Sequence, residues 1–352
     1  MSLLRDFLHR KKQSEIVVLI DIGPDSVAGA YAQYTGGEKP LIHYTRRLPI
    51  EIRKGEPHEE AMLRALGALG DALISEGAPV LVRAVGSASV GTVLVSIDAP
   101  WQTTSVRTEY LEQDESFTFT RDMVIGALKN TSTASAGKML ADESIIGTIL
   151  NGYETRDPYG KRAHRASIIV LTSLIDEQVA KSIHEALRRL YHTKKILTIS
   201  GSSLRYQALC IAFPHERDAL ILDATGPLTS IALIRRDLLM DIIEVPGTPD
   251  TAAWLKNISG KLARLAERFP LPRTIFLLTK EKDLASERKT LDVANLGSLW
   301  LSDNPPKIIA LLASHIIGLV QEATSVTPDL SLLLMALYYQ SRTPEGSLPV
   351  DK

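Results

Sequence analysis

Two stretches of this sequence share one pattern: IVVLIDIGPDSVAGAY at residues 16–31 and ALILDATGPLTSIALI at residues 219–234. In each, an apolar run of strand length ends in a turn that contains Asp and Gly, and a second apolar run follows. A continuous apolar run suits a strand that is buried on both faces, and Asp and Gly favour turns. One such hairpin would be ordinary. Two copies, each followed by another strand and a helix, predict an internal repeat of an α/β domain.

Further elements are predicted outward from each hairpin. After the first come a strand, a helix that begins at Pro57 with Glu59 and Glu60 in its first turn, and two strands. The predicted strands lie at 41–50, 80–85 and 90–97. After the second hairpin the pattern predicts a strand, a helix, a strand and two further helices, at 238–245, 251–269, 274–279, 307–323 and 330–339.

A different pattern fills the region between the two repeats. It contains more Thr and charged residues and predicts a small α+β module. The expected order is strand, helix, polar loop, two strands and a helix, at 102–111, 120–129, 130–138, 144–150, 167–173 and 176–191.

The composition excludes several classes of protein. The 352 residues include 40 Lys and Arg against 41 Asp and Glu, so binding through clustered phosphate contacts to nucleic acid is not expected. The single cysteine, Cys210, cannot form an internal disulfide or a multi-cysteine metal site, and its apolar surroundings predict a core thiol. The run 130–138 ends in Gly-Lys but lacks the spacing of a phosphate-binding P-loop.

No membrane span is predicted. The longest nearly apolar stretch, 308–320, is shorter than the roughly 20 residues a spanning helix needs, and the N-terminus lacks the apolar core of a signal peptide. A cytoplasmic protein is therefore expected. Residues 1–15 form a basic segment, and its first twelve residues carry a net charge of +3. Residues 2–12 are either a short helix that contacts an anionic membrane surface or a frayed basic tail.

The two hairpins resemble the phosphate hairpins of the actin-like ATPase superfamily. The resemblance implies an α/β, two-domain actin-like (ribonuclease H-like) fold, in which backbone N–H groups of both hairpins hold the phosphates of ATP. It also implies that Asp21 and Asp223 contact Mg²⁺ through water. The residues that it places at the nucleotide are Asp21, Gly23, Pro24, Asp25, Ser26, Asp223, Ala224, Thr225, Gly226, Thr229 and Gly247.

The middle module strengthens this resemblance. The runs ILNGY at 149–153 and DPYGK at 157–161 are similar to part of the SHS2-type domain inserted into FtsA and the related PilM proteins. The domains implied in this way are a basic segment, the first part of domain I, the insertion, a return to domain I, domain II and a flexible tail. Their boundaries are 1–15, 16–99, 100–195, 196–217, 218–340 and 341–352.

Several residues depart from the family pattern. Pro24 and Pro227 each remove a backbone N–H in a turn that would otherwise offer it to phosphate. Where the family has a glycine pair at the adenosine, after the strand at 274–279, this chain has Lys280 to Asp283. Only Gly247 remains of the glycine pair that follows the third strand of domain II. We therefore expect weakened nucleotide binding and at most a weak ATPase.

The function that the resemblance favours is an FtsA-like scaffold that links cell-division machinery to the membrane. The alternative is a PilM-like component of a type IV pilus or secretion platform at the inner membrane. Either role implies protein partners, contact with the inner face of the membrane, and self-assembly into an oligomer or filament as a further possibility. A third alternative, from another class, is a sugar-kinase-like enzyme on the same fold.

Overall fold

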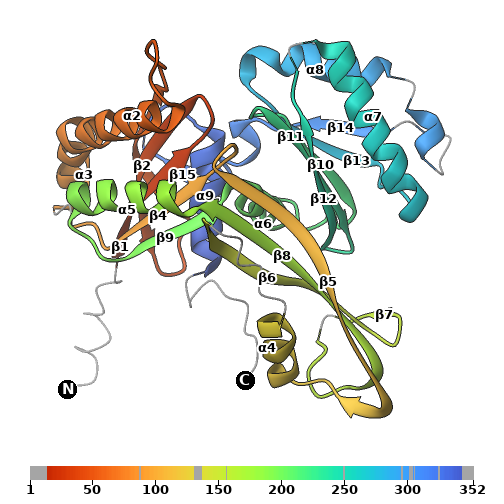
Figure 1. Cartoon of the computed structure of the whole chain (residues 1–352). Coiled ribbons are helices and arrows are strands. Elements are labelled where there is room, and N and C mark those ends of the chain that lie inside the picture. The colour runs from red at the N-terminus through yellow and green to blue at the C-terminus, as the bar shows by residue number, and fades with distance from the viewer. Residues whose placement is uncertain are drawn as a thin grey trace, which may run out of the picture. The chain divides into compact units, whose positions relative to one another are not determined.

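A computed structural model describes residues 14–86, 89–130, 137–155, 157–248, 250–294, 296–300, 304, 306–323 and 326–342 (Figure 1). The chain divides into two compact units. The first comprises Met1–Ile97, Val179–Ala212 and Leu312–Lys352, and the second comprises Asp98–Gln178 and Phe213–Leu311. Residues 1–13 of the predicted basic segment, most of the polar loop at 130–138 and most of the tail at 341–352 lie outside the described residues, whereas Ser14 and Glu15 of that segment begin a strand.

The first hairpin lies at the centre of a six-stranded sheet in the first unit. Strand β1 pairs with β2 in antiparallel fashion and with β4 in parallel fashion. The sheet has the spatial order β15 (Gln321–Glu322), β3 (Leu41–Pro49), β2 (Ser26–Thr35), β1 (Ser14–Ile22), β4 (Thr92–Ile97) and β9 (Ile196–Ser200). The last seven residues of β1 are all buried, as its continuous apolar run predicts.

The second unit repeats this topology. Its five-stranded sheet has the order β12 (Leu238–Pro246), β11 (Leu228–Arg235), β10 (Ala219–Asp223), β13 (Thr274–Leu278) and β14 (Lys307–Ala310). The hairpin strands β10 and β11 are antiparallel, and β10 also pairs in parallel fashion with β13. Apart from the short β15, each sheet therefore places its third, second, first, fourth and fifth strands side by side, when the strands of that sheet are counted along the chain. The internal repeat predicted from the two hairpins is confirmed at the level of strand order.

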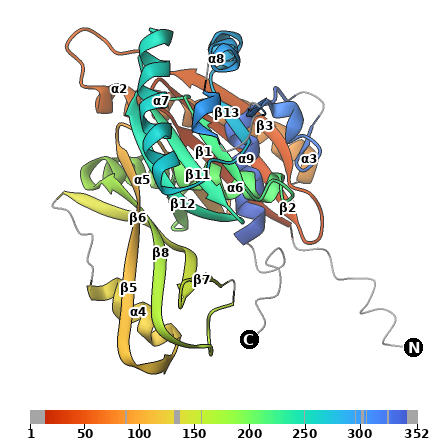
Figure 2. The ribbon, with the colours of Figure 1, turned by 90° about the vertical axis from the view of Figure 1, so that its right-hand side faces the viewer.

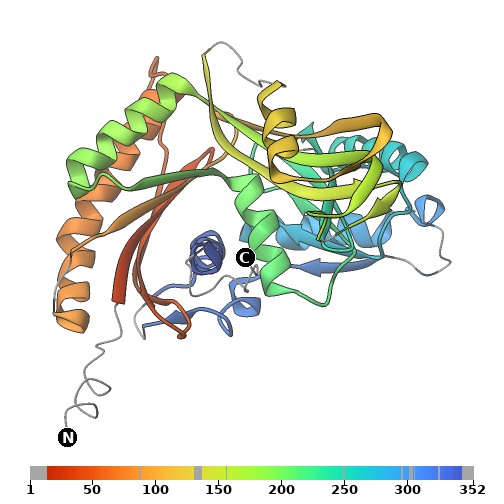
Figure 3. The ribbon, with the colours of Figure 1, turned by 90° about the horizontal axis from the view of Figure 1, so that it is seen from below.

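Helices cover both faces of the first sheet (Figure 3). On one face, α2 (His58–Ala72) runs through a π-helical turn, Leu73–Gly77, into α3 (Ala78–Val85), and α5 (Glu177–Tyr191) lies beside α2. On the other face, α9 (Leu330–Arg342) packs on β1, β2 and β4 and against α6 (Gly201–Ala212). Eight consecutive residues of α9 are buried, so this helix is a core element of the first unit.

The alternating alanines of β2 explain how α9 packs against this sheet. Ala28, Ala30 and Ala32 alternate along this strand, so their side chains share one face of the sheet. The next residue on that face, Tyr34, donates a hydrogen bond of 3.2 Å from its hydroxyl to the carbonyl of Ala336 in α9. Small side chains on the strand therefore leave room for the bulky side chains of the helix.

In the second unit, α7 (Thr251–Arg268) and α8 (Glu281–Val293) pack beside the sheet. The core between them is apolar and includes two tryptophans, both almost fully buried. Its buried members are Leu220, Leu222, Ile231, Leu233, Val245, Trp254, Ile258, Leu262, Leu265, Leu271, Ile275, Leu277, Leu291, Leu296 and Trp300.

The inserted module is a four-stranded antiparallel sheet within the second unit (Figure 2). Its spatial order is β5 (Gln102–Thr118), β8 (Arg162–Asp176), β6 (Lys138–Leu150) and β7 (Tyr153–Glu154). Helix α4 (Arg121–Asn130) covers one face through a small apolar cluster that includes Phe117 and Phe119. Strands β5 and β6 also contact β12. The other helix predicted for the module is α5, and most of its residues belong to the first unit. The SHS2-type identity of the module stays a prediction.

Two predicted elements are wrong. Residues 80–85 form helix α3 rather than a strand, because Pro79 starts a new helical segment directly after the π-helical turn of α2. Residues 307–323 form strand β14, a short 3-10 turn at Ala313–His315 and β15 rather than one helix. Strand β14 exists because it pairs with β13, a contact that local periodicity does not reveal. Helices α6 and α8 are absent from the sequence prediction.

One helical stretch among the described residues, His58–Val85, is long and apolar enough to cross a membrane by length and composition alone. It comprises α2 and α3, and α2 packs against β2 and β3. Core helices of folded domains have the same properties, so this stretch is weak evidence for a membrane span. The predicted domain boundaries stay a prediction, although residues 330–340, assigned to domain II from the sequence, form α9 in the first unit.

Candidate functional site

The first hairpin forms a tight turn. The backbone N–H of Gly23 donates to the carbonyl of Ser26 at 2.9 Å, and that of Ile50 donates to the carbonyl of Asp25 at 2.8 Å. Pro24 stands between these residues, and its carbonyl lies 2.7 Å from Nε2 of His58, which must be the donor. The sequence-predicted residues of this hairpin therefore lie together, and four of their backbone groups form hydrogen bonds within the first unit.

A row of three residues crosses the strands beside this turn. Asp21 of β1 lies opposite Ala28 of β2, and Ala28 lies opposite Arg47 of β3. Residues that are directly opposite in neighbouring strands project from the same face of a sheet. Because Ala28 has only a methyl group, the Arg47 side chain extends over it and reaches the carboxylate of Asp21.

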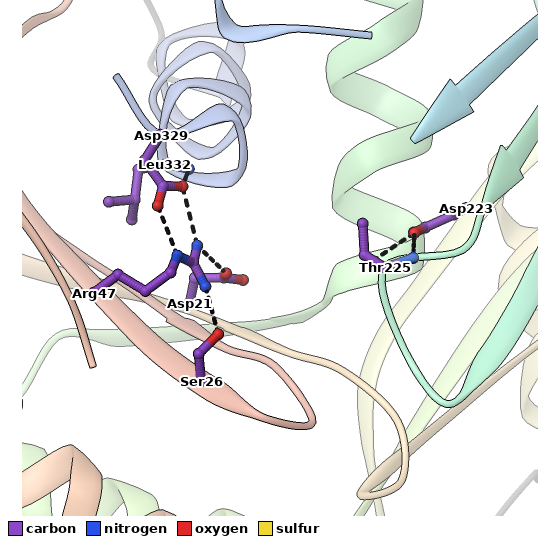
Figure 4. Close-up of polar contacts among 7 residues, drawn as sticks. All are labelled: Asp21, Ser26, Arg47, Asp223, Thr225, Asp329 and Leu332. Atoms are coloured by element: carbon purple, nitrogen blue, oxygen red, sulfur yellow. Dashed lines mark hydrogen bonds and ion pairs between the residues drawn. The ribbon is translucent and has the colours of Figure 1, made fainter. Parts of the chain in front are cut away.

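The guanidinium of Arg47 binds three side chains (Figure 4). It donates to Oδ2 of Asp21 at 3.1 Å, to Oγ of Ser26 at 2.9 Å, and to both carboxylate oxygens of Asp329 at 2.7 and 3.0 Å. Asp329 in turn accepts the backbone N–H of Leu332 at 3.2 Å in the first turn of α9. Two sequence-predicted site residues, Asp21 and Ser26, are therefore bonded to an arginine that sequence reasoning missed.

Electrostatics favours this arrangement. The Asp21 side chain is only 5% exposed, so an unpaired carboxylate there would be costly. Burial of the guanidinium on its own would lower the pKa of Arg47, but the hydrogen bonds and charges of Asp329 and Asp21 outweigh burial and raise its pKa. Both oxygens of Asp329 engage the guanidinium, a bidentate geometry that strengthens such a pair.

The first hairpin does not fit a magnesium ion in this arrangement. The guanidinium of Arg47 already binds Oδ2 of Asp21, so a hydrated Mg²⁺ at this carboxylate would lie beside a fixed positive charge that repels it. Arg47 also donates to the hydroxyl oxygen of Ser26, the small polar residue expected at a phosphate, and so fixes the position of that side chain. In the described part of the chain, no group of three or more His, Cys, Asp or Glu side chains is placed to hold a metal ion.

The second hairpin is held by its own aspartate. Oδ1 of Asp223 accepts the backbone N–H of Thr225 at 3.1 Å and its hydroxyl at 2.6 Å (Figure 4). An aspartate that bonds the residue two positions ahead stabilises a turn. The backbone N–H of Ala224 donates to the carbonyl of Leu278 at 2.8 Å, which ties the turn to β13. This hairpin is therefore ordered by contacts within its own unit.

Gly247 and Thr229 also have local structural roles. The N–H of Gly247 donates to the carbonyl of Pro227 at 2.8 Å, and a Cβ atom at this glycine would lie 2.8 Å from the same oxygen. Only glycine allows this close approach of the β12 end to the hairpin. The hydroxyl of Thr229 accepts the indole N–H of the buried Trp254 at 2.9 Å.

A pocket of about 430 Å³ opens beside the second hairpin, and its lining lies entirely in the second unit. It lies between the hairpin, the end of β12, the start of α7 and the start of α8. The lining residues are Ala224, Gly226, Pro227, Thr229, Gly247, Thr248, Thr251, Trp254, Lys280, Lys282, Asp283, Ser286 and Glu287. Four sequence-predicted site residues, Ala224, Gly226, Thr229 and Gly247, thus meet at one cavity.

The wall of this pocket formed by α8 carries charge. Lys280 and Lys282 occupy the position where the family pattern has glycines, and Glu287 follows one to two turns later. Burial raises the pKa of Glu287, with a further increase from Asp283, while Thr279 and Lys280 oppose the increase. Among the described residues, neither Oε2 of Glu287 nor Oγ1 of Thr279 has a hydrogen-bond partner of acceptable geometry. Helix α8 was not predicted, so its contribution to the pocket was missed.

Comparisons with known proteins give a likeness in fold. No protein-family model matches this sequence, and no curated protein matches it. A chain of the PilM–PilN type IV pilus biogenesis complex is 12% identical, with a TM-score of 0.55 over 95% of this chain and 100% of that chain. A Bacteroides thetaiotaomicron protein with an actin-like ATPase fold and unknown function is 10% identical over 94% and 98% of the two chains, with a TM-score of 0.48.

A Ppx/GppA family member from Aquifex aeolicus is 14% identical over 80% of this chain and 72% of its own, with a TM-score of 0.37. At such identities a likeness describes the fold alone. The repeated strand order of the two sheets and the two turn-forming hairpins agree with it. The chain therefore has the α/β fold of the actin-like ATPases, with a small α+β module inserted.

Proposed function

We propose that this protein is a PilM-like scaffold of a type IV pilus or secretion platform, which binds a protein partner at the inner face of the membrane and does not turn over ATP. The observation that supports this most is the guanidinium of Arg47, which donates to Oδ2 of Asp21 and to the hydroxyl oxygen of Ser26 in the hairpin expected to bind the nucleotide. A hairpin closed in this way supports a binding protein rather than a phosphotransferase.

The pilus role draws support from the extent of the structural likeness. The chain of the PilM–PilN complex matches 95% of this protein over 100% of its own length. A likeness that includes both units and the inserted module favours a scaffold that has kept the whole architecture. By analogy with the complex, the partner is a PilN-like protein. We further propose that residues 2–12 add a peripheral contact with anionic lipid.

The FtsA-like role, favoured by the sequence, remains the alternative. It depended on the stretch from Tyr153 to Gly160, and the turn at the end of this run has a structural explanation. The N–H of Gly160 donates to the carbonyl of Phe119 at 2.9 Å, and the ring of Tyr159 lies 5.8 Å from that of Phe119. These contacts stabilise the module whichever partner the protein has, so the run does not favour division over pilus assembly.

In this proposal, a nucleotide would bind only in the second unit. The pocket beside the second hairpin could accept a nucleoside or another small polar ligand through Thr248, Ser286 and Glu287. With Asp21 engaged by Arg47, such a ligand would bind without help from a magnesium ion at the first hairpin. The proposed function therefore needs neither Mg²⁺ nor hydrolysis.

Two measurements on the purified full chain test the proposal. The chain should co-elute in size-exclusion chromatography with the cytoplasmic segment of a PilN-like protein from the same organism, and a scrambled segment should not co-elute. Phosphate release from ATP or polyphosphate in millimolar Mg²⁺ should stay at the level of a protein-free blank. Sustained phosphate release at enzyme-like rates, or a PilN-like segment that fails to co-elute, would contradict it.

A further inference from the structure

We propose that the guanidinium of Arg47 takes the place of a metal cation at the first hairpin. Its guanidinium holds the place between Asp21 and Asp329 that an inorganic cation would otherwise take, and it thereby fastens the hairpin to α9 regardless of ligand. The proposal goes beyond the scaffold role, since it concerns how the first unit is held together and would stand even if the partner were different.

The guanidinium of Arg47 lies between two carboxylates. One nitrogen of Arg47 donates to Asp21 at 3.1 Å and to Asp329 at 3.0 Å, so a single positive group bridges both carboxylates. The Asp21 side chain is 5% exposed and that of Asp329 is 17% exposed. Two poorly hydrated carboxylates this close would repel each other strongly without a cation between them.

Removal of the guanidinium would leave a space lined by oxygen atoms. The space would be lined by the carboxylates of Asp21 and Asp329 and by the hydroxyl of Ser26, the three groups that Arg47 now binds. Oxygen ligands of this kind are those that Mg²⁺ and Ca²⁺ prefer. The arginine thus fills a place with the chemistry of a cation site, and a variant without it should recover that chemistry.

Asp329 links this site to α9. Asp329 precedes α9, and it accepts the backbone N–H of Leu332 while it binds Arg47. Its two oxygens therefore stabilise the start of the helix and attach it to β3 at the same time. Arg47 lies 282 positions from Asp329 in sequence, so this contact joins two distant segments of the first unit.

The test is the thermal unfolding of the full chain and of Arg47→Ala, with EDTA, Mg²⁺, Ca²⁺ or ethylguanidinium. Loss of the charge should lower Tm by about 5–10 °C in EDTA. Millimolar divalent cation or ethylguanidinium should restore much of that loss, whereas the natural chain should not respond. The matched control is Arg64→Ala: the side chain of Arg64 is 34% exposed against 35% for Arg47, but its ion pair with Glu56 contains only one carboxylate. No cation should rescue it.

A second variant keeps the proposal testable if Arg47→Ala does not fold. Arg47→Ala combined with Asp329→Asn removes one of the two repelling carboxylates, so it should be more stable than Arg47→Ala alone and should have lost the cation response. The proposal is overturned if Arg47→Ala melts like the natural chain, if cations raise the Tm of the natural chain as much as that of the variant, or if the double variant is no more stable than the single one.

Discussion

The indole Nε1 of Trp254 donates a 2.9 Å hydrogen bond to the hydroxyl of Thr229, and both residues are buried. The bond attaches the first turns of α7 to the second hairpin. It explains why a small hydroxyl residue stands at this position, without any need for a phosphate.

Replacement of Thr229 should therefore affect stability before it affects ligand binding. Thr229→Val keeps the shape but leaves the indole N–H of Trp254 without an acceptor, at a cost of about 1–3 kcal/mol in the free energy of unfolding. Thr229→Ser, which keeps the hydroxyl, is the control and should lose less. Urea unfolding measured by tryptophan fluorescence checks both variants. Equal stability of Thr229→Val and the natural chain would show that the bond contributes nothing.

The path of Arg47 across β2 gives a second prediction. Ala28→Leu would place a branched side chain where the guanidinium crosses the strand, in a fully buried position, and overpacking of this kind costs about 1–3 kcal/mol. In an Arg47→Ala background the new side chain has room, so its cost should shrink. A double-mutant cycle on unfolding free energies measures this coupling. Strict additivity would argue against the observed path.

Gly247 gives a third prediction. A methyl group there would lie 2.8 Å from the carbonyl of Pro227, so Gly247→Ala must shift the hairpin backbone and should cost about 1–3 kcal/mol. Gly260 on α7 has open space around its Cβ position and is exposed. Gly260→Ala is therefore the control and should stabilise the chain by up to about 1 kcal/mol. Thermal unfolding of the two variants should shift in opposite directions, and a common direction would contradict the close approach at Gly247.

The pH dependence of Glu287 gives a fourth prediction. Its pKa in the folded chain is raised, chiefly by burial, so the folded state binds this proton more tightly than the unfolded chain does. The group therefore lowers stability above its folded pKa, and this loss disappears as the pH falls below the unfolded value of about 4.3. Glu287→Gln should raise Tm at pH 7 and have little effect near pH 4.

The control for this prediction is Glu267→Gln, since Glu267 is exposed on α7. It should change Tm little at either pH. A Glu287→Gln variant that is less stable than the natural chain at pH 7 would indicate that the ionised carboxylate is stabilised in the pocket, contrary to its surroundings.

Much of the fold follows from the sequence because the strands that form the two sheet centres are continuous apolar runs. The patterns at residues 16–31 and 219–234 predict both hairpins, and the observed sheets repeat one strand order. Prediction failed where an element depends on distant partners. Residues 307–310 form a strand because β13 lies beside them, although the surrounding apolar run has helical periodicity.

The site was predicted in part for the same reason. Asp21 and Asp223 were identified because they end apolar strands, a local feature. Arg47 and Asp329 were missed, because their contact depends on the register of three strands and on the return of α9 to the first unit. The one local signal was the small residue at Ala28, which leaves a path across the sheet, but its meaning depends on knowing which residues lie opposite it.

The most direct test of the account is a calorimetric titration of the full chain with the cytoplasmic segment of the PilN-like partner, once in EDTA and once in Mg²⁺ with ATP. Because Arg47 already occupies Asp21, the account predicts binding in EDTA with the same dissociation constant as in Mg²⁺ and ATP. Binding that appears only in the presence of Mg²⁺ and ATP would contradict it.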